Sequence, residues 1–290
     1  MHGVTLRADR TVSAPGEHRP GTSVVGVETD DITALLHEVA ATVITPRFRS
    51  LADGEVHEKN PGDLVTVADR EAEAVLTERL SAAHPDAVVV GEEAVAGDPG
   101  LLDRYTAADH AFIIDPVDGT KNFVQGSPDH AVMLAELRDR AVVRGWIHHP
   151  QHATTYVAER GAGAFRDGER LRAVVPDGEP ATWRGTTSRR PWLRRSLDGL
   201  APLELTWVCC GVDYVRLLEG EAAYLLYRNG KPWDHAPGSL LLAEAGGTLV
   251  DVDGAAYDPT RLFEGVMVAA GSPDVAAVVR EAWRRGDGPH

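Results

Sequence analysis

The sequence predicts a layered α/β (α+β) fold, and three observations lead to this prediction. Apolar residues recur at helical spacing in the segment 30–48, and short β-branched runs follow from about residue 87. Beyond residue 177, helical and strand patterns are mixed rather than strictly alternating. Strict alternation of strand and helix would instead predict a doubly wound parallel sheet. We therefore expect helices and sheets stacked in layers.

The first part of the chain predicts two helices followed by strands. One helix is expected from Asp30, an aspartate that can cap it, and a second from about Asp69 to Ala83. Strands are expected at "AVVVGEE" and "HAFIIDP", in a hairpin of "HAVMLAEL" and "AVVRGWIHHP", and at "TTYVAERGAGAF". Residues 1–28 show no sustained period and are rich in Pro, Gly, Ser and Thr, so a disordered tail is predicted there.

The second part of the chain predicts a mixture of both kinds of element. Strands are expected at "ATWRGTTS", "LELTWV", "AAYLLYR" and "TLVDVDG". Helices are expected after Arg190, at "VDYVRLLEG", at "WDHAPGSLLLAEAGG" and from about Pro273 to Arg285. The third of these helices is expected to end at Gly246, a residue type that favours helix C-termini.

Composition excludes several classes of protein. The 290 residues carry a net charge of −15, which argues against binding to a nucleic-acid backbone. Cys209 and Cys210 are adjacent and the only cysteines, so no disulfide framework is expected and a reducing, cytoplasmic location is predicted. No apolar run approaches the roughly 18 residues of a membrane span, and no signal peptide is expected.

Acidic residues stand at the ends of apolar runs or at the starts of expected helices in four places. They are Asp69, the pair Glu92 and Glu93, the pair Asp115 and Asp118, and Asp234. Taken alone, Asp69 and Asp234 are better explained as helix caps and Glu92–Glu93 as a solvated strand end, and the pair Asp115 and Asp118 could form a turn. Together they favour a hard divalent cation such as Mg²⁺, because such a cation requires several oxygen ligands.

The nonapeptide "DPVDGTKNF" (115–123) adds an anion site beside this cation. Pro116 fixes the backbone, so that both aspartates project from a rigid turn and the carbonyl of Val117 is free to act as a ligand. Gly119 permits close approach, and Thr120 begins a helical turn whose N–H groups can hold a phosphate. No Walker loop or G-x-S-x-G elbow is present, so attack of metal-activated water on a phosphate ester is the expected chemistry.

Four segments, in this order, resemble motifs of the inositol monophosphatase superfamily of Mg²⁺-dependent, lithium-sensitive phosphatases. They are "KNPGDLVTVAD" (59–69), "GEE" (91–93), "DPVDGTKNF" (115–123) and "WDHAPG" (233–238), which "EAGG" (244–247) follows. The resemblance covers about residues 30–285. It implies an α-β-α-β-α sandwich and a homodimer. It also implies two halves, 29–160 and 161–290, that form one catalytic unit with the site between them.

The resemblance implies specific roles. Glu92, Asp115, the Val117 carbonyl and Thr120 would surround one Mg²⁺, Asp118 and Asp234 would join Asp115 around a second, and a third ion would use Glu92 through water. Asp69 and Thr120 would orient and deprotonate the attacking water, with Glu92 counted among the catalytic residues. Gly119 and Thr120 amides would hold the phosphate, with Asp118 and Asp234 also facing the substrate.

The substrate pocket departs from the family pattern. Inositol monophosphatases carry an acidic residue seven positions before the aspartate of the W-D motif, which is Asp234 here; that position is Tyr227, with Arg228 next to it. Cys209 falls near the stretch that lines the family's pocket. The default expected substrate is myo-inositol 1-phosphate. The alternatives are histidinol phosphate, an adenosine 3′,5′-bisphosphate, or a non-catalytic binding relative.

Overall fold

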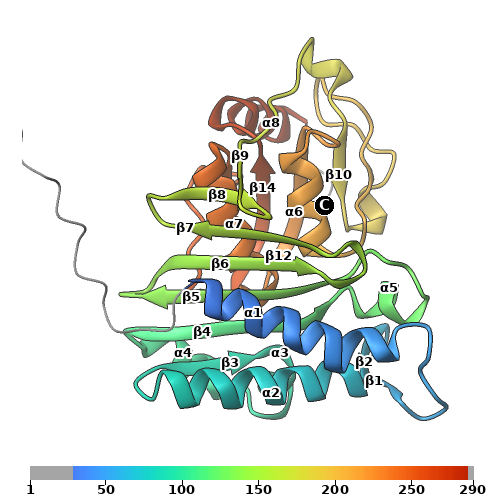
Figure 1. Cartoon of the computed structure of the whole chain (residues 1–290). Coiled ribbons are helices and arrows are strands. Elements are labelled where there is room, and N and C mark those ends of the chain that lie inside the picture. Colours follow the sequence, from blue (N-terminus) through green and yellow to red (C-terminus); the bar gives the residue numbers. More distant parts are fainter. Residues whose placement is uncertain (1–28, 287–290) are drawn as a thin grey trace, which may run out of the picture.

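The computed structural model describes residues 29–286, and the predicted tail, residues 1–28, lies outside the described residues. Figure 1 shows five layers: α1 and α2, a seven-stranded sheet, α6 and α7, a five-stranded sheet, and α8. The contacts agree, since α2 packs on β4, α7 packs on β4–β8 and on β13, and α8 packs on β12–β14. The predicted α-β-α-β-α sandwich is confirmed.

The helical elements are α1 (Thr29–Val39), α2 (Val67–Ala83), α3 (Glu92–Gly97), α4 (Leu101–Ala107), α5 (Thr120–Val124), α6 (Cys210–Leu218), α7 (Pro232–Ala245) and α8 (Pro273–Arg285). A π-helical turn η1 (Ala40–Ile44) extends α1, and short 3₁₀ turns are η2 (Thr45–Arg47), η3 (Pro150–His152), η4 (Pro180–Thr182) and η5 (Arg190–Trp192).

The strands are β1 (Val56–Asn60), β2 (Asp63–Thr66), β3 (Val88–Gly91), β4 (His110–Asp118), β5 (Ala131–Arg138), β6 (Ala141–His149), β7 (Thr154–Glu159), β8 (Gly163–Arg166), β9 (Glu169–Leu171), β10 (Gly185–Thr187), β11 (Glu204–Leu205), β12 (Tyr224–Gly230), β13 (Thr248–Asp251) and β14 (Phe263–Ala270). The seven-stranded sheet has the order β3-β4-β5-β6-β7-β8-β9, with β3 parallel to β4 and the other pairs antiparallel. The five-stranded sheet has the order β11-β10-β12-β14-β13, and β1 pairs with β2.

The two sheets are buried on both faces, and alternate residues of a strand therefore enter different cores. On β4, Phe112 and Ile114 pack against α1 and α2, whereas Ile113 faces the central layer. On β12, Leu225 faces the central layer, whereas Leu226 faces α8. Burial on both faces explains why these strands appear in the sequence as uninterrupted apolar runs.

Several predicted elements differ in the structure. The helix expected after Arg190 is only the 3₁₀ turn η5, because Leu193, with a ψ of 138°, already leaves the helical conformation and Arg194 follows it with a φ of 63°. The strand expected at "LELTWV" has two residues. The hairpin β1–β2 and the strand β14 had not been predicted, although β14 lies between β12 and β13 inside its sheet.

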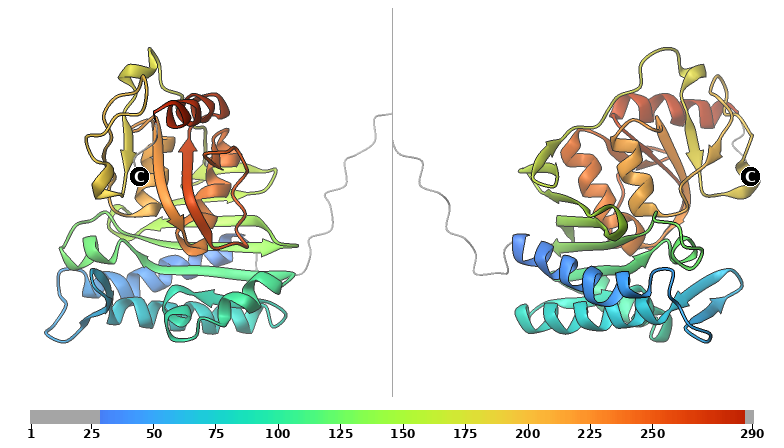
Figure 2. Two further views of the ribbon diagram at one scale, coloured as in Figure 1. Left: turned by 180° about the vertical axis from the view of Figure 1, so that it is seen from behind. Right: turned by 45° about the vertical axis from the view of Figure 1, so that its right-hand side comes forward.

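The two proposed halves meet within this architecture. The seven-stranded sheet continues past residue 160 through β8 and β9, so a division at 160/161 falls between two strands of one sheet. Figure 2 shows α6 and α7 lying between the two sheets. The chain therefore brings the N-termini of α6 and α7 to the edge at which β4 ends, and this edge is where acidic residues gather.

The packing of α6 on α7 leads to a stability prediction. A Cβ atom at Gly238 of α7 would come within 2.2–2.4 Å of three ring carbons of Tyr214 on α6. We expect Gly238→Ala to lower the free energy of unfolding by about 1–3 kcal/mol, the usual scale of overpacking. Gly97→Ala is the matched control, because that helical glycine has no atom within 4 Å of an added Cβ. Urea unfolding would measure both, and equal stabilities would contradict the expected packing constraint.

Candidate functional site

Two neighbouring parallel strands place the first two carboxylates of the site side by side. Gly91, the last residue of β3, is paired with Ile114 of β4, so Glu92 and Asp115 follow at the same level. The pairing of β4 with β5 is interrupted between Asp115 and Asp118. This irregularity follows from Pro116, which has no N–H to donate to a neighbouring strand. The sequence therefore bends the strand where its two aspartates stand.

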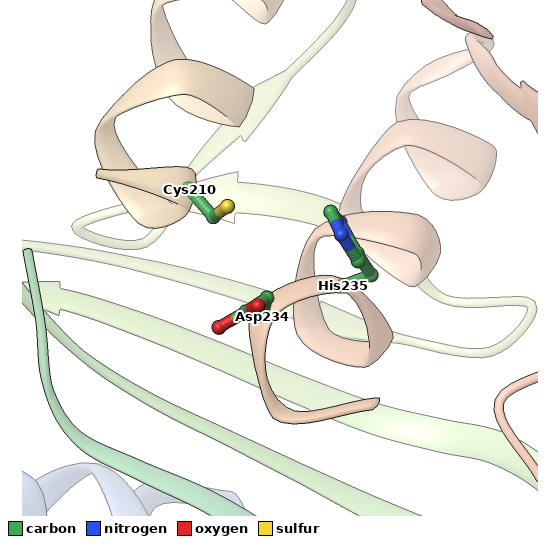
Figure 3. Close-up of side chains that lie close together, drawn as sticks. All are labelled: Cys210, Asp234 and His235. Carbon is green, nitrogen blue, oxygen red and sulfur yellow. The ribbon is translucent and has the colours of Figure 1, made fainter. Parts of the chain in front are cut away.

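The second half of the chain supplies a third aspartate. Asp234 lies in the first turn of α7, a position where the helix dipole favours negative charge (Figure 3). One carboxylate oxygen from each of Asp115, Asp118 and Asp234 lies within 4.8 Å of the other two. Asp118 and Asp234 are 116 residues apart in the sequence, and the fold brings them together.

These carboxylates raise one another's pKa values. Burial raises the pKa of Asp115 well above its usual range, and the charges of Glu92 and Asp118 raise it further, followed by those of Asp234 and Asp69. Burial also raises the pKa of Asp234 well above its usual range. The cluster is therefore unfavourable as a set of bare anions, and positive charge at this place would lower its free energy.

Asp118 is held by the N-terminus of α6. One of its carboxylate oxygens accepts a hydrogen bond from the backbone N–H of Gly211, and the Cys209 thiol donates to the same oxygen at 3.1 Å. Gly119 has a φ of 80°, and a Cβ atom there would lie 2.9 Å from the Cβ of Cys209. The turn after Asp118 therefore requires glycine, because both its backbone conformation and its contact with Cys209 exclude a side chain.

Asp69 serves two purposes. It completes a capping box at the start of α2, where one carboxylate oxygen accepts from the backbone N–H of Thr66 at 2.9 Å. Its other oxygen accepts the hydroxyl hydrogen bond of Thr120 at 3.0 Å, and that hydroxyl also lies 3.1 Å from the carbonyl of Val117. Burial raises the pKa of Asp69 to about 6. The N-cap of α2 is thus Thr66 and not Asp69 as expected; Asp69 contributes to the cap from the third helical position, and this role is compatible with its contact to Thr120.

Glu92 and Glu93 begin α3 rather than ending a solvated strand. Lys59 of β1 binds both, at 2.8 Å and 2.7 Å. Glu73 of α2, which sequence reasoning missed, accepts the backbone N–H groups of Glu93 and Ala94 at 2.8 and 2.7 Å. Burial raises the pKa of Glu73 to about 7. Glu73 stands four residues after Asp69 and therefore on the same face of α2, which is the one signal that could have identified it.

An open cavity of about 1030 Å³ adjoins this edge. Among its lining residues are Lys59, Glu73, Glu92, Lys231 and Trp233, whereas Asp115 and Asp118 do not line it. The Lys231 ammonium also lies 5.1 Å from the centre of the Trp233 ring, a cation–π distance. The cavity is thus wide enough for a small organic molecule, and Glu92 is part of its lining.

The expected pocket residues lie in different surroundings. Tyr227 is 3% exposed, and its hydroxyl donates to Asp213 at 3.2 Å, an interaction that the sequence did not reveal. Cys209 is buried against Asp118, whereas Arg228 is exposed. Tyr227 thus packs in the core between α6 and β12. An aromatic ring, and not a free carboxylate, therefore occupies the position where the family pattern implies an acid.

Oxygen ligands and an unpaired acceptor together fit a hard divalent cation. Asp115 Oδ1 is buried and has no hydrogen-bond partner among the described residues, although burial of an unpaired acceptor is costly. Mg²⁺ takes oxygen ligands at about 2.0–2.1 Å, and the three aspartates supply oxygens that lie within 4.8 Å of one another. His148, His149 and His152, which stand close together in the sequence, belong to neither three-residue ligand group found in residues 29–286.

Comparisons with known proteins identify the family to which this chain belongs. The family model of the inositol monophosphatase family matches residues 28–285. An inositol-1-monophosphatase of Rhizobium meliloti is 32% identical over 249 residues, covering 82% of this chain and 89% of that protein. A fructose-1,6-bisphosphatase/inositol-1-monophosphatase of Thermotoga maritima is 32% identical over 212 residues, covering 68% and 75%. The solved structure of an IMPase of Thermotoga maritima has a TM-score of 0.71 at 26% identity, covering 88% and 98%.

In the part of the chain that the structure describes, no helix has both the length and the apolar composition required to cross a membrane.

Repulsion within the carboxylate cluster leads to a prediction about cation binding. We expect Asp115→Asn to stabilise the metal-free protein by about 1–3 kcal/mol at mildly alkaline pH, because one buried, unpaired charge is removed. The same substitution should reduce the increase in melting temperature that Mg²⁺ produces in the parent protein.

Asp53→Asn is the matched control, since Asp53 is exposed and remote from the cluster in sequence. Differential scanning calorimetry with and without Mg²⁺ would measure all three proteins. An unchanged Mg²⁺ response in Asp115→Asn would contradict the assignment of Asp115 as a ligand.

Proposed function

Because this chain belongs to the inositol monophosphatase family, whose members hydrolyse phosphate monoesters, we propose that it is a Mg²⁺-dependent phosphomonoesterase acting on a small polyol or sugar phosphate. The observation that carries the proposal is the convergence of Asp115, Asp118 and Asp234, with one unpaired buried oxygen, beside the Asp69–Thr120 pair. The first substrate to test is myo-inositol 1-phosphate, because a 32% identical relative is an inositol-1-monophosphatase.

Two sets of residues would hold Mg²⁺. Glu92, Asp115 and the Val117 carbonyl would hold one ion, and Asp118 and Asp234 together with Asp115 would hold a second. A third, weaker ion near Glu92 is part of the same proposal. When bound, Mg²⁺ would lower the pKa of water and neutralise charge that develops on the phosphate oxygens.

The protein's own groups would accept the proton of the attacking water and hold the phosphate in place. Thr120 and Asp69 would receive a proton from the attacking water, because the Thr120 hydroxyl already donates to Asp69. The water oxygen would form a bond to phosphorus while the ester P–O bond breaks. The leaving alkoxide would take a proton from a second water, and the hydroxide so formed would take the proton held at Asp69. Backbone N–H groups of Gly119 and Thr120 would hold the phosphate oxygens.

The substrate pocket supports a second candidate class. Tyr227 stands where the family pattern implies an acid, and Lys231 and Glu92 both line the cavity. A substrate with a second anionic or imidazole-bearing group, such as a sugar bisphosphate, a nucleoside bisphosphate or histidinol phosphate, is compatible with this exchange. A non-catalytic role is disfavoured, because every predicted metal ligand is present in the sequence.

Three further properties belong to this proposal. Inhibition by Li⁺ and assembly as a homodimer follow from the motif resemblance described above. A cytoplasmic location is supported by the two free cysteines, Cys209 and Cys210, of which Cys209 is buried.

The proposed reaction is tested by phosphate release from a panel of esters. The panel holds myo-inositol 1-phosphate, fructose 1,6-bisphosphate, histidinol phosphate and adenosine 3′,5′-bisphosphate, each with and without Mg²⁺ and Li⁺. We expect Mg²⁺-dependent turnover of one ester above the others, and loss of almost all turnover in Asp115→Asn, whose fold should persist. Near-normal turnover in Asp115→Asn would contradict the assignment of Asp115 as a metal ligand. If phosphate is released from none of the esters, the proposed phosphomonoesterase activity is contradicted.

The hydroxyl of Thr120 provides a separate test of proton transfer. We expect Thr120→Val to lower kcat by about 10²–10⁴-fold, the usual contribution of a positioned proton acceptor, because it disconnects Asp69 from the water. Thr120→Ser keeps the hydroxyl and should retain most of the rate. Steady-state kinetics at saturating Mg²⁺ would decide, and an equal loss in both variants would contradict a role for the hydroxyl.

A further inference from the structure

A second group of metal-ligating side chains adjoins the aspartate cluster and has a different chemistry. Cys210, the first residue of α6, faces the first turn of α7, from which Asp234 and His235 project (Figure 3). One ligand atom from each of these three residues lies within 4.8 Å of the other two. Asp234 therefore belongs to two groups, one made only of carboxylates and one that contains a thiol and an imidazole.

The thiol-containing group suits a soft or borderline cation better than Mg²⁺. Sulfur and imidazole nitrogen are ligands of Zn²⁺ and related metals, whereas Mg²⁺ selects oxygen. Zn²⁺ bonds of about 2.0–2.3 Å at tetrahedral angles separate ligand atoms by about 3.5 Å, so shifts on the order of 1 Å would close the site. Three protein ligands and one position left to water would complete a four-coordinate arrangement.

The surroundings restrict the imidazole. His235 is 2% exposed, and the Tyr214 hydroxyl lies 2.8 Å from its Nδ1. Tyr214 follows Cys210 by four residues on α6 and so lies on the same face of that helix. A contact of this kind orients a ligating histidine ring, and a bound cation would share or displace it.

Cys209, which precedes Cys210 in the sequence, has a different environment. Cys209 is directed at Asp118, whose carboxylate accepts its thiol hydrogen bond at 3.1 Å, and it is not a member of the thiol–imidazole group. Two adjacent cysteines thus have separate surroundings, which gives an internal control for any effect that depends on sulfur.

We propose that Cys210, Asp234 and His235 form a binding site for a thiophilic divalent cation such as Zn²⁺ or Cd²⁺. On binding, the Cys210 thiol releases its proton to solvent and the thiolate sulfur donates to the cation, with no change of oxidation state. Because Asp234 is shared, occupancy by this cation excludes Mg²⁺ from one of its proposed ligands. The cation would therefore inhibit Mg²⁺-dependent turnover, a consequence that rests on the proposed function, whereas binding itself does not.

The binding test uses the absorption that arises from charge transfer between a thiolate and Cd²⁺. Full-length protein is titrated with Cd²⁺ in the absence of substrate. We expect the band in the parent protein and in Cys209→Ser, and its loss in both Cys210→Ser and Cys210→Ala. Circular dichroism would check that each variant is folded. A band that persists in the folded Cys210 variants, or no band in the parent protein, would overturn the site.

The inhibition test separates this site from the proposed reaction. Each protein's turnover is expressed relative to its own rate without Zn²⁺. We expect the half-inhibiting Zn²⁺ concentration to rise by at least about tenfold in Cys210→Ser, a typical loss for a metal site deprived of a supporting group. Equal inhibition of both proteins would overturn the competition at Asp234. If no ester is hydrolysed, the proposed function fails, while the Cd²⁺ band still decides the metal site.

Discussion

Five carboxylates converge at one edge of the seven-stranded sheet, and their mutual repulsion is the constraint that governs the structure around them. They are Asp69, Glu92, Asp115, Asp118 and Asp234. Burial alone disfavours the ionised form of Asp115, and the charges of its neighbours raise its pKa further. Such an arrangement costs stability in the absence of a cation. Its persistence in a well-packed fold is understandable when cation binding returns free energy to the folded state.

The architecture holds these groups in place from three directions. The parallel pairing of β3 with β4 sets Glu92 beside Asp115, and the first turn of α7 brings in Asp234. The N-terminus of α6 satisfies Asp118 through the amide of Gly211. Glu73 accepts the first amides of α3 and thereby fixes the segment that carries Glu92. Rigid elements, and not loops alone, therefore position the cluster.

The chemistry and the selectivity of the site come from different parts of the chain. The groups proposed for metal binding and proton transfer lie mostly on β4, α2 and the turn before α5. Tyr227, which departs from the family pattern, and the cysteines Cys209 and Cys210 lie on the α6–β12 side. A shared reaction with an altered substrate or inhibitor response is the expected outcome of such a division.

Much of this protein is determined by its sequence alone. Local patterns of 2 and 3.6 residues, with capping and turn residues, predicted the layered fold and most helices and strands. Acidic residues at the edges of these elements, together with the resemblance to family motifs, predicted Glu92, Asp115, Asp118 and Asp234 as one set. Local patterns failed where long-range pairing decided the outcome, as in β14, or where an extended and a left-handed residue ended a helical turn early, as after Trp192. Three contacts were shown only by the tertiary structure. Glu73 accepts a backbone hydrogen bond from the start of α3, the Tyr227 hydroxyl donates to Asp213, and Cys210 lies close to His235. Contacts between residues far apart in the chain, or between side chains of two packed helices, depend on how elements stack, and no local pattern encodes that stacking.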